Sequence, residues 1–198
     1  MSEIVLWGHP DSGHACKVAL GLALGGIPHK VRVVDIWAPR EARPPEFLSA
    51  SPLAEVPMLT IDGAPYFQSG AILLELGIRF GVLGGQTAAG LRRARELMMW
   101  EANRIGMCLP QLKGRATLDP AVVAWLEARY AIDCASFEKL LGDAPFFHGD
   151  QAGLGDCAIW GYAQWLPEAG VAPTPKMAAW IARMCALPVM KTPAEFFA

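Results

Sequence analysis

A proline stands directly before a short apolar segment: Val56-Pro57 leads into the run Met58 to Ile61. Proline has no backbone N–H to donate to a sheet, and it holds the preceding residue in extended geometry. Most X-Pro bonds are trans. If this one is cis, the N–H and C=O of Val56 face outward, where they can pair with an extended peptide. The segment therefore predicts a strand that begins abruptly at Met58, next to backbone groups without a sheet partner.

Strand and helix signals alternate before this point. Ile4 to Trp7 predicts a buried strand, and apolar residues at helical spacing over 15–23 predict a helix that ends at Gly25-Gly26. Polar and apolar residues alternate from Lys30 to Ile36, which is typical of a strand. Ala38 to Pro52 is Pro-rich and is predicted to be irregular. Two strands joined by a helix must run parallel, so this part predicts a β-α-β unit.

A hairpin and a helix follow the irregular region. Asp62-Gly63 separates the apolar runs 58–61 and 64–67, and this dipeptide is the strongest short signal for a β-hairpin. Ser69 is a good N-cap for a helix from Gly70 to about Phe80. The order β-α-β, link, β-β-α predicts a small mixed sheet covered by helices.

From Gln86 onward the pattern is helical. Segments bounded by Pro and Gly predict Ala88–Leu112, Pro120–Leu141, Gly155–Glu168 and Pro175–Leu187 as helices. Gly84-Gly85 lies in the short segment 81–86, which we interpret as a linker. The sequence thus predicts two domains, 1–80 and 87–198.

Composition limits the function classes. The net charge of −2 argues against nucleic acid or an anionic membrane as partner. No apolar run approaches the roughly 18 residues of a membrane helix, and the first residues lack the pattern of a signal peptide. The five cysteines are scattered without a CxxC, which favours reduced thiols in the cytoplasm over disulfides or a metal site. The high apolar fraction, 53%, indicates a subunit interface or a ligand groove.

Four pieces of the chain, in this order and spacing, resemble the cytosolic glutathione S-transferases of the bacterial type, with a serine at the catalytic position. They are Gly8 to His14, Ser51 to Leu59, Gln68 to Leu73 and Leu154 to Ile159. The resemblance covers essentially the whole chain. It implies a thioredoxin-like α/β N-terminal domain, an all-α C-terminal domain and a cytoplasmic homodimer active in detoxification. It also implies glutathione as co-substrate, with no tightly bound cofactor and no metal.

The resemblance also implies a glutathione site around the abrupt strand. Val56-Pro57 would be cis, with the backbone of Val56 paired to the cysteinyl part of glutathione, while Gln68 and Ser69 hold the γ-glutamyl end. A serine at a helix N-terminus can offer its hydroxyl and free N–H groups to a carboxylate. A plain N-cap explains Ser69 equally well, and both roles can hold together.

Ser12 is the candidate catalytic residue, because its hydroxyl can stabilise the thiolate of glutathione. Lowering a thiol pKa by ~2 units from about 8.5 requires about 2.7 kcal/mol of preference for the anion. A helix N-terminus and one hydrogen bond to the charged sulfur together supply a free energy of that size. The alternative is that Ser12 only caps its helix. Cys16, one turn later, is predicted to be a buried apolar residue rather than a redox nucleophile.

Other site residues follow from the resemblance. Relatives place a His-Lys pair before Pro45-Glu46-Phe47 to meet the glycyl carboxylate; here Arg43 matches the lysine, Ala42 replaces the histidine, and Arg40 could substitute. The electrophile would lie among side chains of the first-strand loop and the long helix of the second domain. The candidates are Trp7, His9, His14, Asn103 and Met107. Asp156 would cap its helix without the Ser or Thr partner that relatives have, since Gly153 stands there.

Three functions remain open at this point. The first is a glutathione transferase acting on a small hydrophobic electrophile. The second uses the same site for glutathione-dependent reduction of a disulfide or peroxide. The third is a non-catalytic interaction module on the same fold, which the loss of the histidine at Ala42 favours. The electrophile cannot be derived from the fold.

Overall fold

The computed structural model describes residues 2–198; Met1, the first residue of the predicted N-terminal domain, lies outside the described residues. Its sheet has the strand order β2-β1-β3-β4. The strands are β1 (Ile4–Gly8), β2 (Lys30–Val33), β3 (Met58–Ile61) and β4 (Ala64–Phe67). β1 and β2 are parallel and β3 and β4 are antiparallel, as predicted, and β3 also pairs antiparallel with β1. The second strand ends at Val33, three residues earlier than predicted.

Three helices pack around this sheet, and two predictions about them need correction. They are α1 (Gly13–Leu24), α2 (Pro45–Ala50) and α3 (Ser69–Phe80). The region predicted to be irregular contains α2, whose first residue is a proline, and the 3-10 turn η1 (Arg40–Ala42). Proline suits the first helical position because the N–H it lacks has no partner there. α3 begins at Ser69 with Gln68 as its N-cap residue, so Ser69 is not the N-cap.

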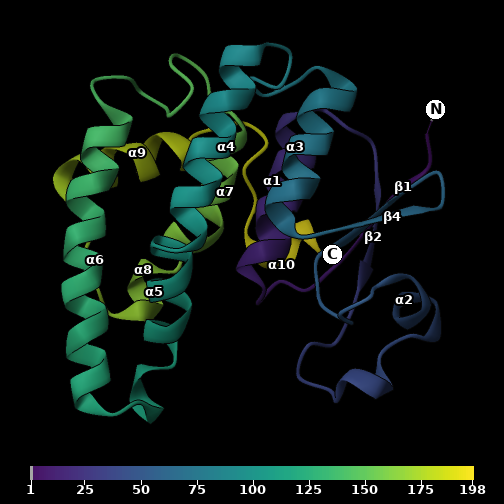
Figure 1. The fold of residues 1–198 in the computed structure, drawn as a ribbon, viewed down its shortest axis with the longest axis horizontal. Coiled ribbons are helices and arrows are strands. Elements are labelled where there is room, and N and C mark those ends of the chain that lie inside the picture. Colours follow the sequence, from purple (N-terminus) through teal and green to yellow (C-terminus); the bar gives the residue numbers. More distant parts are fainter. Residues whose placement is uncertain (1) are drawn as a thin grey trace.

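The second half is all helical (Figure 1). Its elements are α4 (Ala88–Ala102), α5 (Ile105–Lys113), the 3-10 turn η2 (Arg115–Thr117), α6 (Pro120–Leu141), α7 (Leu154–Ala163), α8 (Leu166–Ala169), α9 (Pro175–Cys185) and α10 (Pro193–Phe196). α6 has the predicted bounds. The helix predicted over 88–112 is broken, because Arg104 has a non-helical backbone (φ −123°, ψ −102°). The helix predicted over 155–168 is also divided, and α10 was not predicted.

The two halves share one apolar core. A single cluster of buried side chains extends from β1, α1 and α3 of the first half to α4–α7 and α9 of the second. α3 ends at Phe80 and α4 begins at Ala88, so the predicted linker 81–86 lies between elements. The mixed sheet with its helical second half confirms the predicted fold class. In the described part of the chain, no helix is long and apolar enough to cross a membrane.

Helices α1 and α7 cross at two glycines. A Cβ built on Gly13 would lie 2.6 Å from the carbonyl oxygen of Gly161, and a Cβ on Gly161 would lie 2.6 Å from that of Gly13. Both distances are shorter than any real carbon–oxygen contact of this kind, so neither position accepts a larger residue without movement. This close approach brings the start of α1 against the second half of the molecule.

A buried ion pair also joins the halves. Lys17 of α1 and Glu101 of α4 are each 2% exposed, and 2.8 Å separates Nζ from Oε2. Burial lowers the pKa of Lys17 and raises that of Glu101, while the attraction between the two groups opposes both shifts. The other carboxylate oxygen, Oε1, has no hydrogen-bond partner among the described residues.

Candidate functional site

The segment before β3 forms a tight loop that ends in the predicted bond. The Ser51 hydroxyl accepts a hydrogen bond from the N–H of Glu55 (3.3 Å), and Ala54 has a left-handed backbone (φ 52°). The Val56-Pro57 bond is cis, which confirms that prediction. Among the residues that the structure describes, neither the N–H nor the C=O of Val56 pairs with another backbone group. Both are therefore available to an extended ligand.

The two arginines of the preceding region hold this loop. Arg43 donates to the carbonyl of Ala54 and, over 3.2 Å, to that of Ile36. Arg40 donates to the carboxylate of Glu55 over 2.7 Å. Both guanidinium groups thus already have protein acceptors, whereas the sequence predicted Arg43 as a partner of the glycyl carboxylate.

A small cavity brings most of the predicted glutathione residues together. Its volume is about 70 Å³, and its lining consists of His14, Ser51, Leu53, Glu55, Val56, Pro57, Phe67, Gln68 and Ser69. Ligand pockets usually measure roughly 300–1,000 Å³. This cavity can therefore enclose one end of a tripeptide, while the remainder would lie along the open backbone of Val56.

The start of α3 forms one wall of this cavity. Gln68 has a left-handed backbone (φ 68°, ψ 110°), which costs a residue with a side chain about 1–3 kcal/mol and is most frequent at functional sites. Ser69 is buried, and its hydroxyl lies 3.2 Å from Nδ1 of His14. The backbone N–H groups of the first turn of α3 have no partner within the helix, so they can receive a carboxylate.

His14, which the sequence predicted among the residues around the electrophile, lines the same cavity as Val56, Gln68 and Ser69. Its Nδ1 lies 3.4 Å from the Nζ of Lys17 as well as 3.2 Å from the hydroxyl of Ser69. The ring is exposed in the cleft, yet the surrounding protein and then the charge of Lys17 lower its pKa to about 4. His14 is therefore neutral near pH 7. Because an ammonium can only donate, Nδ1 accepts and the ring proton resides on Nε2.

Ser12 occupies the N-terminus of α1. It is the N-cap residue, and its hydroxyl oxygen accepts a hydrogen bond from the N–H of Ala15 (3.2 Å). A hydroxyl that accepts one bond can still donate its own proton. The capping role and a role toward a thiolate are therefore compatible.

The residues predicted for the electrophile do not form one group. Trp7 is only 8% exposed and packs against Phe47 in a second small core. Nδ1 of His9 accepts from the N–H of Asp11, over 3.1 Å. Asn103 is exposed at the end of α4, and Met107 is half-buried in α5.

Cys16 and Asp156 are buried, and their hydrogen bonds are made within the protein. Cys16 is buried, its thiol donates to the carbonyl of Pro10 (3.3 Å), and burial raises its pKa to about 12. It is therefore not a thiolate at neutral pH. Asp156 is fully buried and accepts from the N–H of Gly153 (3.0 Å) and from Nε1 of Trp180 (2.8 Å). It orients the start of α7.

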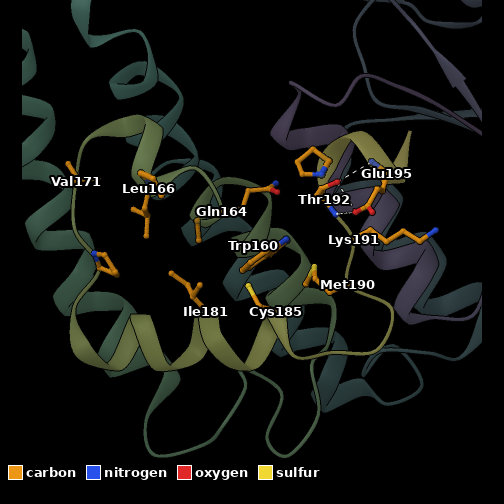
Figure 2. A pocket seen from close by; sticks show the side chains of 14 residues that line it. Trp160, Gln164, Leu166, Val171, Ile181, Cys185, Met190, Lys191, Thr192 and Glu195 are labelled. Carbon is orange, nitrogen blue, oxygen red and sulfur yellow. Dashed lines mark hydrogen bonds between the residues drawn. The ribbon is translucent and has the colours of Figure 1, made fainter. Parts of the chain in front are cut away.

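A much larger cavity lies elsewhere. It measures about 750 Å³, is lined by residues of α7 to α10 and their connections, and shares no residue with the small cavity. Figure 2 shows Trp160, Leu166 and Ile181 around it. Its size alone does not connect it with the predicted chemistry, which depends on the Val56 backbone and on Ser69.

Sequence reasoning missed three residues around the site, which are Lys17, Ser51 and Glu55. Lys17 could have been identified from the sequence, because it is a charged residue in the largely apolar sequence of α1. Such a lysine must find a buried partner, although its local sequence does not name Glu101. Ser51 and Glu55 flank the Val56 segment, yet their mutual hydrogen bonds depend on the loop geometry.

Comparisons with known proteins agree with this geometry. Residues 11–77 match the family model described as glutathione S-transferase, N-terminal domain. A solved structure of a possible glutathione S-transferase from Rhodopseudomonas palustris is 30% identical, covers 96% of this chain and 97% of that one, and has a TM-score of 0.81. The chain therefore belongs to the glutathione S-transferase family.

Two curated bacterial relatives carry different activity names. The disulfide-bond oxidoreductase YfcG of Escherichia coli is 25% identical, over 75% of this chain and 73% of its own length. Maleylacetoacetate isomerase of Rhizobium meliloti is 28% identical, over 80% of this chain and 79% of its own length. Several solved transferases with the same fold, at 20% to 23% identity, contain bound glutathione.

Proposed function

We propose that this chain binds glutathione and stabilises its thiolate for attack on a small hydrophobic electrophile. The observation that carries the proposal is the convergence of Val56, Gln68, Ser69 and His14 on one cavity near the start of α1. The zwitterionic γ-glutamyl end would enter the cavity. Its carboxylate would meet the first N–H groups of α3, and its ammonium group the lone pairs of Ser69, whose proton points to His14.

The cysteinyl part would then lie along Val56, beside the cis bond to Pro57. Ser12 would donate to the sulfur at the N-terminus of α1, where the helix dipole also favours an anion. Arg43 would act indirectly, by holding the carbonyl of Ala54 and so the loop that carries Val56. We further infer a cytoplasmic homodimer in which glutathione is a co-substrate rather than a tightly bound cofactor.

Calorimetric titration with glutathione tests the binding step. We expect binding by the wild type and a loss of at least tenfold in affinity for Ser69→Ala, because the contact with the ammonium group of the ligand and the link to His14 both depend on the Ser69 hydroxyl. Ser136→Ala, on α6, is the matched control and should bind normally. Absence of heat and of thermal stabilisation at millimolar glutathione would remove the proposal.

A glutathione-dependent disulfide reductase is the second candidate, because one curated relative is named a disulfide-bond oxidoreductase. The raised pKa and the burial of Cys16 mean that such a reaction would use the thiol of glutathione and not that of Cys16. Turnover of an aryl halide against turnover of a disulfide, each with wild type and Ser12→Ala, separates the two reactions. Glutathione binding with neither turnover would favour the non-catalytic module.

A further inference from the structure

Lys113, the last residue of α5, carries a charge that no carboxylate of the described residues neutralises. No Asp or Glu lies within ion-pair distance of its ammonium group. Instead the group lies over the ring of Trp165, with 3.6 Å between Nζ and the ring centroid. A cation held against an aromatic face in this way has a defined position but keeps its full charge.

Trp165 connects this charge to the start of α1. A Cβ built on Gly13 would lie 2.8 Å from Cζ3 of Trp165, so the ring edge touches the residue that follows Ser12. The indole ring of Trp165 therefore lies beside both the ammonium of Lys113 and Gly13, the neighbour of the candidate catalytic serine. The positive charge of Lys113 also acts on Cys16 in the first turn of α1. Burial raises the pKa of that thiol, and the charge of Lys113 opposes this rise in pKa.

The neighbouring charges leave Lys113 as the available cation. Asp11 accepts from Nε1 of Trp37 over 3.4 Å, and its side chain is exposed to solvent. Arg115, two residues after Lys113, is paired with Glu127 and also donates to backbone carbonyls. An anionic group that approaches Ser12 from the side of α5 would thus meet a cation that has no competing carboxylate.

We propose that Lys113 binds a carboxylate of the electrophile, so that the preferred substrate is a small apolar molecule with an anionic end. This inference rests on the proposed function. In the reaction, the thiolate attacks an electrophilic carbon, a C–S bond forms, and the leaving group departs with its electron pair. The carboxylate is not consumed. The apolar body would lie near the start of α1, and the charge would select which electrophiles bind productively.

A carboxylate could also belong to the departing half of a mixed disulfide. In that case the thiolate attacks one sulfur, a new S–S bond forms, and the carboxylate-bearing thiol leaves as its thiolate. The recognised chemistry is the same in both reactions. A carboxylated aryl halide and a mixed disulfide of glutathione with mercaptopropionate separate the two sources, each compared with an uncharged analogue.

Binding of two glutathione conjugates tests the inference without turnover. S-(para-carboxybenzyl)glutathione and S-benzylglutathione differ only in the carboxylate. We expect the wild type to bind the carboxylated conjugate roughly fivefold to tenfold more tightly, as one partly exposed ion pair allows. Lys113→Met should abolish this ratio and leave the affinity for S-benzylglutathione within about twofold. Lys139→Met, an exposed lysine on α6, is the control and should retain the ratio.

The alternative outcomes are distinct. Equal wild-type affinity for the two conjugates would overturn the role of Lys113 and leave the proposed function intact. Loss of both affinities in a folded Lys113→Met would also overturn it, because the residue would then support the site rather than recognise charge. Failure of the wild type to bind either conjugate would contradict the proposed function itself. In turnover, Lys113→Met should lower kcat/KM for a chlorodinitrobenzoate about fivefold and spare its methyl ester.

Discussion

At the scale of single residues, the hydroxyl group of Ser12 has an observed capping role and a proposed role toward a thiolate. Its oxygen caps α1 by accepting from Ala15, and its proton is free for an anion at the same helix end. The first role concerns folding and the second concerns chemistry. A substitution should therefore have a small effect on stability and a large effect on the rate. Loss of an N-cap costs about 1 kcal/mol, which a chain of this size tolerates.

Ser12→Ala should lower kcat/KM for an aryl halide about tenfold to a hundredfold, because one hydrogen bond to the charged sulfur is lost. The pKa of the bound glutathione thiol, measured from the pH dependence of the rate, should rise by about 1–2 units. Ser12→Thr keeps the hydroxyl and should retain most of the activity. An unchanged pH profile for Ser12→Ala would exclude Ser12 from thiolate stabilisation.

His148 predicts a pH dependence of stability. Its Nε2 accepts from the N–H of Gly155 (3.0 Å), and burial together with the charge of Arg93 lowers its pKa to about 4. Between pH 4 and the ordinary value of about 6.5, the unfolded chain binds a proton that the folded chain does not. The contribution of neutral His148 to the free energy of unfolding is therefore fully present above pH 6.5 and is lost as the pH falls toward 4.

Urea unfolding at pH 7 and pH 5 measures this effect. The free energy of unfolding of the wild type should be smaller at pH 5. In His148→Gln the decrease should be shallower, while the contribution of His14, whose pKa is also lowered to about 4, should persist. Equal decreases in the two proteins would show that His148 does not titrate between these states.

At the scale of elements, the crossing of α1 and α7 positions the site. Gly13 and Gly161 allow the two backbones to approach, and this contact fixes where α1 presents Ser12 and His14. The hydrophobic pattern of α7 does not indicate the crossing, since every residue of this helix is buried. The information lies in two glycines from distant parts of the sequence.

Gly161→Ala should destabilise the protein, because the added Cβ would lie 2.3 Å from Cγ of Lys17 and 2.6 Å from the carbonyl oxygen of Gly13. Overpacking of this kind costs about 1–3 kcal/mol and should lower Tm by several degrees. Gly114→Ala, whose Cβ would meet only an ordinary contact of 3.5 Å, is the control. Equal Tm values for the two variants would mean that α7 moves freely.

At the scale of the whole molecule, one core and one ion pair connect the predicted domains. The apolar cluster extends through both halves, and Lys17 meets Glu101 across their boundary. The chain should therefore unfold as one cooperative unit, despite its two-domain pattern of elements. Far-ultraviolet circular dichroism, which follows mainly the helices, and tryptophan fluorescence from both halves should give the same midpoint.

Lys17→Met should cost about 3–5 kcal/mol, because it leaves the buried carboxylate of Glu101 without its partner. The double variant Lys17→Met/Glu101→Leu should recover much of that loss, since two apolar residues need no compensation. The double variant also removes the donor to His14, so glutathione binding should weaken even where stability returns. Normal binding by a stable double variant would contradict this link.

The sequence by itself determined the features that depend on near neighbours. The Asp62-Gly63 hairpin, the start of β3 at Met58 and the bounds of α6 all follow from turn chemistry, proline and short-range periodicity. The cis bond of Val56-Pro57 and the family were predicted from motifs in the right order. Such signals are local, so they can be identified without knowledge of the fold.

Only the tertiary structure decided how the site is assembled. The break in the helix at Arg104, the engagement of Arg43 by Ala54, and the contact of His14 with Ser69 each depend on residues far apart in the sequence or on backbone geometry. Tertiary packing then sets the charges, because it lowers the pKa of His14 to about 4 and removes the Lys17–Glu101 pair from water. The motif Val56-Pro57 predicted backbone groups without a sheet partner, and the fold determined which side chains surround them.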